Sequence, residues 1–279
     1  MNQATGLTGF VKDSPVKVIA VTSGKGGVGK TNVSVNLSVA LSRLGRRVML
    51  MDADLGMANV DVLLGLHPAW NLSHLINGER SLEEIIIDGP EGIQIIPAAS
   101  GIQAMAHLSP AEHMGMVNAF GSLGGRLDVL ITDTAAGISD GVTTFAAAAH
   151  EVIVVVCDEP ASITDAYAMI KVLSTEQKVG RFHVLANMVR SADEGIRLYK
   201  KLSLVCDRFL DINLRYVGAI PHDEMLRKAV QRQQPVVKAF PGCMASRAFG
   251  RVAKTVDDWR LSRDVNGGLQ FFIERLTAT

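Results

Sequence analysis

Short runs of valine, isoleucine and leucine recur along the chain, and longer segments of mixed polar and apolar residues separate them. The runs are nearly continuous rather than alternating, which is typical of strands buried on both faces of a sheet. The pattern predicts an α/β fold: a single doubly wound, mostly parallel sheet with helices on both faces. The predicted strands are 17–22, 47–51, 93–96, 127–132, 151–157, 181–186 and 215–219.

The two ends of the chain depart from this pattern. Residues 1–15 are polar and contain glycine, so we predict a flexible N-terminal extension, followed by one domain over 16–265. Residues 266–279 are predicted as a C-terminal amphipathic helix, because four apolar residues fall on one helical face. That face either packs on the core or rests weakly on a membrane or a partner. Its members are Leu269, Phe272, Ile273 and Leu276.

Composition narrows the class of protein. Of 279 residues 48% are hydrophobic, which is enough for a large core, and the 28 basic and 28 acidic residues cancel. A neutral chain has no strong overall field for nucleic acid, so direct DNA binding is not expected. The basic residues are concentrated in 181–263, either as a solvated face or as a docking surface for an acidic partner or lipid head groups. Three widely spaced cysteines and no apolar run long enough to span a membrane predict a cytoplasmic protein.

The run from Ser23 to Thr31 is rich in glycine and follows an apolar strand candidate. A predicted helix over 32–44 comes next, and strand, glycine loop and helix together are the context of a phosphate-binding P-loop. The glycines allow backbone N–H groups to approach phosphate oxygens, and the helix N-terminus adds its positive dipole end. Lys30 is predicted to contact the β and γ phosphates, and the Thr31 hydroxyl to bind Mg²⁺. The predicted nucleotide-binding residues here are Gly24, Lys25, Gly26, Gly27, Val28, Gly29, Lys30, Thr31 and Asn32.

Carboxylates follow two other strand candidates. Asp52 and Asp54 come after the apolar run 47–51, and Asp133 ends the run 127–132. Because the carboxyl ends of parallel strands form the ligand-binding edge of such sheets, these side chains should project into one crevice. An apolar strand ending in Asp is the Walker B pattern, whose carboxylate holds Mg²⁺ against the P-loop hydroxyl.

Lys25, near the start of the loop, goes beyond a general P-loop. The run Lys25-Gly-Gly-Val-Gly-Lys-Thr31 resembles the deviant Walker A motif of the MinD/ParA family of ATPases, in which this second lysine reaches the partner's nucleotide across a dimer. The resemblance implies ATP/ADP and Mg²⁺ as ligands, Lys25, Lys30 and Asp54 as catalytic residues, and Thr31, Asp52 and Asp133 around the metal. Asp54 would orient or deprotonate the attacking water, and Asp52 would support the Mg²⁺ shell.

The resemblance also implies a base-binding site and a switch. Asn187 matches the asparagine that hydrogen-bonds the adenine edge in this family, and Met188 stands where a basic residue commonly follows. The loop of Pro221, His222 and Asp223 resembles the wall on the other side of the base. Residues 135–137 resemble the segment that senses the γ phosphate.

Three longer stretches resemble the flagellar-number regulators of the FlhG/FleN branch, namely 29–37, 52–65 and 157–167. The N-terminal Asn2-Gln3-Ala4 and Leu7 resemble that branch's GTPase-activating motif, with Asn2 in place of an acid and Thr8 in place of an arginine. Membership would imply a slow, partner-stimulated ATPase that forms an ATP-dependent homodimer in the cytoplasm, at the inner membrane or at the cell pole. The implied partners are an FlhF-type signal-recognition-particle GTPase, a σ54-dependent flagellar transcription activator and flagellar C-ring proteins.

Other functions stay open at this point. A MinD-like cell-division ATPase and a ParA-like positioning ATPase share the same motifs, and a regulator that binds ATP without hydrolysing it would also retain Lys30. An iron–sulfur carrier on this fold is disfavoured, because no C-x-x-C pair occurs and no cysteine lies between Asp133 and Glu151.

Overall fold

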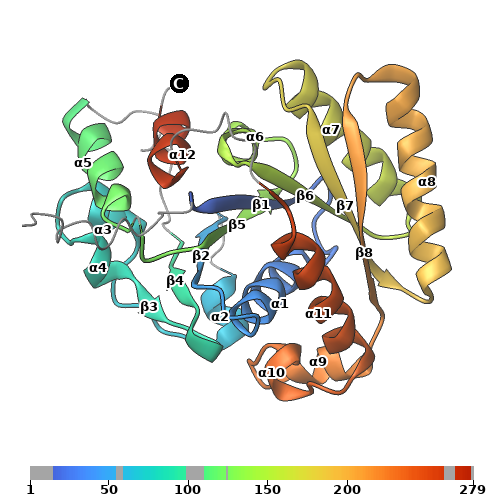
Figure 1. The fold of residues 1–279 in the computed structure, drawn as a ribbon, viewed down its shortest axis with the longest axis horizontal. Helices are drawn as coiled ribbons and strands as arrows, with labels where there is room; N and C mark the ends of the chain where they lie inside the picture. Colours follow the sequence, from blue (N-terminus) through green and yellow to red (C-terminus); the bar gives the residue numbers. More distant parts are fainter. Residues whose placement is uncertain (1–14, 55–58, 99–109, 124, 261–267, 278–279) are drawn as a thin grey trace, which may run out of the picture.

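The computed structural model describes residues 15–54, 59–98, 110–123, 125–260 and 268–277. Its centre is one eight-stranded sheet in the order β3-β4-β2-β5-β1-β6-β7-β8, parallel except for the pair of β3 and β4 (Figure 1). The strands are β1 (Lys17–Ser23), β2 (Val48–Ala53), β3 (Ile87–Asp88), β4 (Gln94–Ile96), β5 (Val129–Ala136), β6 (Glu151–Val156), β7 (Arg181–Val189) and β8 (Asn213–Pro221).

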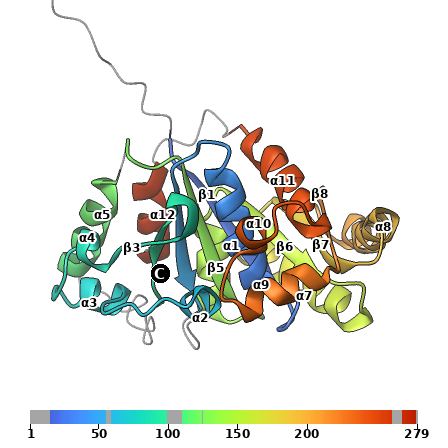
Figure 2. The ribbon, with the colours of Figure 1, turned by 90° about the horizontal axis from the view of Figure 1, so that it is seen from below.

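Helices cover both faces of the sheet. One layer holds α5 (Pro110–Gly121), α6 (Asp140–Ala148), α7 (Pro160–Thr175), α8 (Ala192–Phe209) and α12 (Gly268–Thr277). The other layer holds α1 (Lys30–Ser42), α9 (Glu224–Gln231), α10 (Val236–Ala239) and α11 (Met244–Asp257), as Figure 2 shows from below. The short helices α2 (Val60–Leu64), α3 (Leu72–Ile76) and α4 (Leu82–Ile85) and the 3₁₀ turn Pro90–Gly92 connect β2 to β4.

The central strands are buried because they lie between two helical layers, whereas the edge strands β3 and β8 are partly exposed. Every residue of β2 and β6 is buried, and the apolar residues of the sheet divide into one core cluster on each face. This is the doubly wound α/β sheet that the continuous apolar runs predict. All seven predicted strands are present, with β5, β7 and β8 each longer than predicted. The two-residue antiparallel β3 is too short to be recognised as an apolar run.

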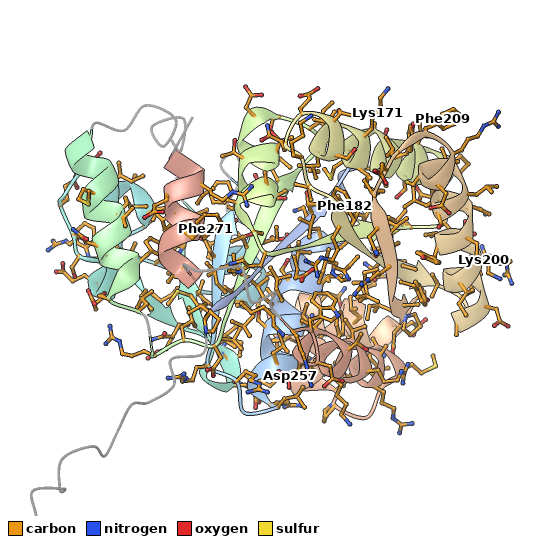
Figure 3. All side chains as sticks on the ribbon, turned by 45° about the horizontal axis from the view of Figure 1, so that its top comes forward. Lys171, Phe182, Lys200, Phe209, Asp257 and Phe271 are labelled. Carbon is orange, nitrogen blue, oxygen red and sulfur yellow. The ribbon has the colours of Figure 1, made fainter. Side chains whose placement is uncertain are left out.

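The C-terminal helix packs on the core. Leu269, Phe272, Ile273 and Leu276 of α12 are almost fully buried. Phe272 lies against Phe145 of α6 with ring centroids 6.4 Å apart. Phe271, labelled in Figure 3, is half-buried at the edge of this contact. Of the two readings left open for this tail, packing is therefore the one observed. Contact of residues 269–276 with a membrane stays a prediction, and it requires α12 to leave this position.

Two predicted motifs lie partly or wholly outside the described residues. The N-terminal segment with Asn2, Gln3, Ala4 and Leu7 is not described, nor are residues 55–58 of the acidic motif after β2. The predicted domain boundaries at 15/16 and 265/266 remain predictions. In the part of the chain that is described, no helix has the length and hydropathy needed to cross a membrane.

Candidate nucleotide-binding site

The glycine loop lies between β1 and α1 and is shaped by the lack of side chains at three positions. Gly27 and Gly29 have φ angles of +80° and +82°, which disfavour residues with a Cβ. A Cβ on Gly24 would lie 2.2 Å from the backbone carbonyl of Asp165 in α7, so the loop's start is pressed against that helix. At Gly26 and Gly27 a Cβ would meet open space. The loop therefore has a packed base and an open, backbone-lined rim.

Lys30 points from the first turn of α1 to the end of β5. Its Nζ lies 3.6 Å from Oδ1 of Asp133, and the two side chains are 8% and 0% exposed. Ser34, one turn further along α1, donates a hydrogen bond of 2.7 Å to the same oxygen. The Thr31 hydroxyl lies close enough to Asp133 to lower the pKa of its carboxyl. The structure thus brings Lys30 and Thr31 of α1 next to Asp133 of β5. Ser34 was missed, although its i+4 spacing from Lys30 places both on one helical face.

Asp133 is held in an environment that favours a bound cation. Burial raises the pKa of its carboxyl, and Lys30, Thr31 and Ser34 partly oppose that shift. Its Oδ2 has no hydrogen-bond partner among the described residues. An orphaned buried carboxylate oxygen beside a threonine hydroxyl is a fitting position for Mg²⁺.

Asp52 is the neighbour of Asp133 across the β2–β5 pair, but its carboxylate is used differently. It accepts three backbone N–H groups, from Asp54 at 3.0 Å, Asn59 at 3.0 Å and Val60 at 3.1 Å. Burial and then the nearby Asp133 raise the pKa of Asp52 to about 6, against the lowering effect of these amides. Asp52 thus fixes the chain around α2, and a direct or water-mediated role at the metal remains a prediction.

Asp54 lies just beyond β2 and is only half-buried. Its Oδ2 accepts a hydrogen bond of 3.1 Å from the Asn59 side chain. Asp52 near the end of β2 and Asp54 just beyond it are therefore both tied to the start of α2, and Asp54 stands at the same sheet edge as Asp133. That Asp54 orients or deprotonates the attacking water remains a prediction.

Lys25 differs from Lys30 in its exposure and in its ion-pair partner. Its side chain is 38% exposed, and Nζ forms an ion pair of 2.6 Å with Oε2 of Glu159, just before α7. The hydrogen bond with Glu159 raises the pKa of Lys25. The first lysine of the loop therefore lies at the surface, away from the Asp133 cluster. The sequence gives no signal for this pairing, because 134 residues separate the two side chains.

The predicted base-binding residues gather at the carboxyl ends of β7 and β8. Asn187 is buried, and its Nδ2 donates a hydrogen bond of 2.7 Å to the carbonyl of Val28, so it clamps the glycine loop. Pro221 pairs with Val189 in the adjacent strand. His222 is exposed at the end of this edge.

Asp223 is turned toward the protein backbone. Its carboxylate accepts hydrogen bonds of 2.9 Å from the backbone of Met225 and of Ala245, and so caps α9 and fixes the start of α11. Burial works against the charged form, yet these amides lower the pKa of Asp223. The contacts assign it a structural role, and contact with a base remains a prediction.

This arrangement fits a nucleoside triphosphate with a divalent cation. Open backbone at Gly26 and Gly27, a buried lysine, and a hydroxyl next to an orphaned carboxylate oxygen are the groups that P-loops present to phosphates and Mg²⁺. Within the described ranges, no group of three or more His, Cys, Asp or Glu side chains is placed to hold a metal. Mg²⁺ would therefore depend on Thr31, Asp133, phosphate oxygens and water, which is how this ion is commonly held.

Comparison with known proteins decides the family. The family model described as ParA, NUBPL iron-transfer P-loop NTPase, matches residues 15–257. The chain is 59% identical over 262 residues to the antiactivator FleN of Pseudomonas aeruginosa, covering 94% of each chain. This chain belongs to the ParA/MinD family of P-loop NTPases, in its FleN/FlhG branch. It is also 36% identical to the flagellum site-determining protein YlxH of Helicobacter pylori, over 88% of this chain and 83% of the relative.

Solved structures of the family support the site's interpretation. The MinD protein of Pyrococcus horikoshii, complexed with Mg-ADP, matches with a TM-score of 0.70 and 28% identity over 87% of this chain and 96% of its own. The cell-division ATPase MinD of Pyrococcus furiosus matches with a TM-score of 0.70 and 26% identity, covering 86% of this chain and 98% of its own. This chain thus shares its fold with a protein that holds Mg-ADP.

The three cysteines are not suited to the iron transfer that the name of the matched family mentions. Cys157 and Cys206 are buried, and burial raises the pKa of each thiol to about 11. Cys243 caps the start of α11. Thiols with raised pKa are poor metal ligands, because the thiolate is the form that binds.

Proposed function

We propose that this chain is an ATP-driven dimerisation switch that limits flagellar number. The observation that carries the proposal is the contrast between the two loop lysines. Lys30 is buried against Asp133 within its own site, whereas Lys25 is exposed on Glu159. A positive charge at the surface beside a phosphate site is available to a second molecule.

In this proposal ATP binds at the glycine loop, with Lys30 on the β and γ phosphates. Bound Mg²⁺, held by Thr31 and Asp133, supplies charge neutralisation for the phosphates. Two protomers then meet face to face, and each Lys25 leaves Glu159 for the partner's phosphates. Asp54 orients water for hydrolysis, and loss of the γ phosphate releases residues 135–137 and separates the protomers.

The energetic requirement is modest. Moving the population from about 1:99 to 99:1 in favour of the dimer requires roughly 5.5 kcal/mol of differential binding. Two lysines that gain phosphate contacts only in the dimer are a suitable source, since charge-assisted hydrogen bonds contribute on the order of 1.5–3 kcal/mol each.

The flagellar assignment rests on the relatives. One is named an antiactivator and the other a flagellum site-determining protein. We accordingly propose as partners a σ54-dependent flagellar activator, an FlhF-type GTPase and C-ring proteins, with action in the cytoplasm at the inner membrane or cell pole. A cell-division role of the MinD type is the second candidate, supported by the MinD structures that the chain resembles.

Light scattering coupled to size-exclusion chromatography tests the switch. We expect a monomer with Mg-ADP and a dimer with Mg²⁺ and a non-hydrolysable ATP analogue. The Lys25→Ala variant should bind the analogue and remain monomeric. Glu159→Gln is the matched control, because it frees Lys25 without removing it, and it should dimerise. A dimer of Lys25→Ala that is as stable as the wild-type dimer would refute the cross-dimer role.

A further inference from the structure

A hollow lies between the C-terminal end of α1 and α11, far from the nucleotide site. Its volume is about 450 Å³. One wall is apolar and is made by Ala40, Leu44, Val237 and Pro241. Since α1 is 13 residues long, the hollow stands about 20 Å from the glycine loop at the other end of that helix.

The opposite wall is a row of cations on α11. Arg247, Arg251 and Lys254 line the hollow and are exposed. Their spacing of four and three residues places them on one helical face, about 6 Å and then about 4.5 Å apart along the axis. The other face of α11 is buried against the domain. The row is therefore presented outward as a unit.

These three charges are not neutralised by their surroundings. No carboxylate of the described residues forms an ion pair with Arg247, Arg251 or Lys254, although the exposed Asp258 stands four residues after Lys254. Two other acids of this region are paired with other arginines. Glu91 pairs with Arg43 at 3.1 Å, and Asp257, at the end of α11 in Figure 3, pairs with Arg46 at 2.6 Å. The row thus keeps its charge for a ligand.

Gly250 leaves the space between the cations open. It lies within α11, where glycine costs about 1 kcal/mol relative to alanine. A Cβ there would meet nothing within 4 Å, so a side chain fits without a clash inside the protein. A larger residue at 250 would instead project into the hollow.

We propose that this hollow, defined by Leu44, Val237, Gly250 and the three α11 cations, docks an acidic amphipathic helix of a partner protein. Carboxylates one and two turns apart on such a helix match the spacing of the row, and its apolar edge lies on the opposite wall. A nucleic acid would use the cations but not the apolar wall. The proposal goes beyond the ATP switch and does not depend on it. The hollow lies at the other end of α1 from the glycine loop, so a dimer contact at that loop leaves it accessible.

Fluorescence anisotropy with a fluorescein-labelled amphipathic peptide tests the site. The probe carries glutamates at i, i+4 and i+7 beside leucines, and its matched form carries glutamines. We expect the glutamate peptide to bind the full chain, and Arg247→Gln/Arg251→Gln to weaken binding at least roughly tenfold. Gly250→Leu should weaken binding similarly with every cation retained. Arg227→Gln/Lys228→Gln on α9, outside the hollow, should leave binding unchanged.

Affinity should be equal with ADP and with an ATP analogue, and equal in Lys25→Ala, so failure of the switch leaves this result intact. The proposal is overturned if the glutamate peptide does not bind, if the glutamine peptide binds equally well, or if the α9 control loses as much affinity. It is also overturned if a random-sequence DNA duplex or anionic lipid vesicles, rather than the peptide, depend on Arg247 and Arg251.

Discussion

Lys30 and Asp133 face each other inside the protein, with Nζ 3.6 Å from Oδ1 and both side chains buried. The lysine begins α1 and the aspartate lies near the end of β5, so the pair joins the glycine loop to the centre of the sheet. In the absence of nucleotide it keeps two charges satisfied that would each be costly alone.

Replacing Lys30 by alanine should therefore impair both binding and stability. We expect ATP affinity to fall at least roughly a hundredfold, since contacts to two phosphates are lost. The free energy of unfolding without nucleotide should fall by about 1–3 kcal/mol, because Asp133 loses its counter-charge. Calorimetric titration and urea unfolding measure the two effects. The double variant Lys30→Ala/Asp133→Asn should regain stability but not binding, whereas unchanged ATP affinity in Lys30→Ala would contradict this assignment.

Asp54→Ala should separate binding from turnover. Because Asp54 lies just beyond β2 and is not part of the glycine loop, the variant should bind ATP normally. Its hydrolysis rate should fall by about 10²–10⁴-fold if the carboxylate acts on water, and it should accumulate as the ATP-bound dimer. Phosphate release and light scattering measure these outcomes, with Asp61→Ala on α2 as the control. Wild-type turnover in Asp54→Ala would remove this residue from the mechanism.

Two glycines of the loop should respond in opposite ways. Gly24→Ala brings a Cβ within 2.2 Å of the Asp165 backbone, so we expect unfolding to become easier by about 1–3 kcal/mol. Gly26→Ala meets open space, and stability should change by no more than about 0.5 kcal/mol. The same Cβ enters the phosphate-facing rim and should weaken ATP binding. Thermal unfolding and nucleotide titration of both variants measure these effects. Equal stability of Gly24→Ala and Gly26→Ala would contradict the loop geometry described above.

His150 should make stability depend on pH. Burial lowers the pKa of its imidazole below the usual 6.5, and Nδ1 accepts a hydrogen bond of 3.0 Å from the Val18 backbone. The folded state therefore binds fewer protons there than the unfolded state, and stability present above pH 6.5 is lost as the pH falls toward the lowered pKa. Urea unfolding between pH 5 and pH 7.5 should show this loss in the wild type and in His67→Asn, an exposed control. The loss should be smaller in His150→Phe; an identical pH profile in that variant would exclude His150 as its source.

The strands and the phosphate site are well encoded locally. The central strands are mostly apolar runs, because burial on both faces leaves few polar positions, whereas the edge strand β8 alternates and carries Asn213 and Arg215. Lys30, Thr31 and Asp133 meet as expected because the ends of parallel strands and the loop after β1 share one edge. The short β3 and the helices between β2 and β4 carry too few residues for a periodic signal.

The roles of several site residues depend on backbone contacts, some distant and some within their own loop, that the sequence does not indicate. Asn187 holds the carbonyl of Val28, 159 residues away, and Asp223 holds the start of α11. Asp52 is bound by three amides of its own loop. In each case a motif identifies a polar residue near the nucleotide edge, but only the packed chain determines which backbone groups it engages.

In the proposed dimer each active site is shared between two protomers. Mixing two inactive variants tests this sharing most directly. In a dimer of Lys25→Ala with Asp54→Ala, the first protomer keeps its own Asp54 and receives Lys25 from the second, so one complete site forms. We predict that the mixture hydrolyses ATP, whereas each variant alone does not, and that Lys25→Ala mixed with Lys25→Ala/Asp54→Ala stays inactive. If the activity of the first mixture equals the sum of its separate components, the shared site is contradicted.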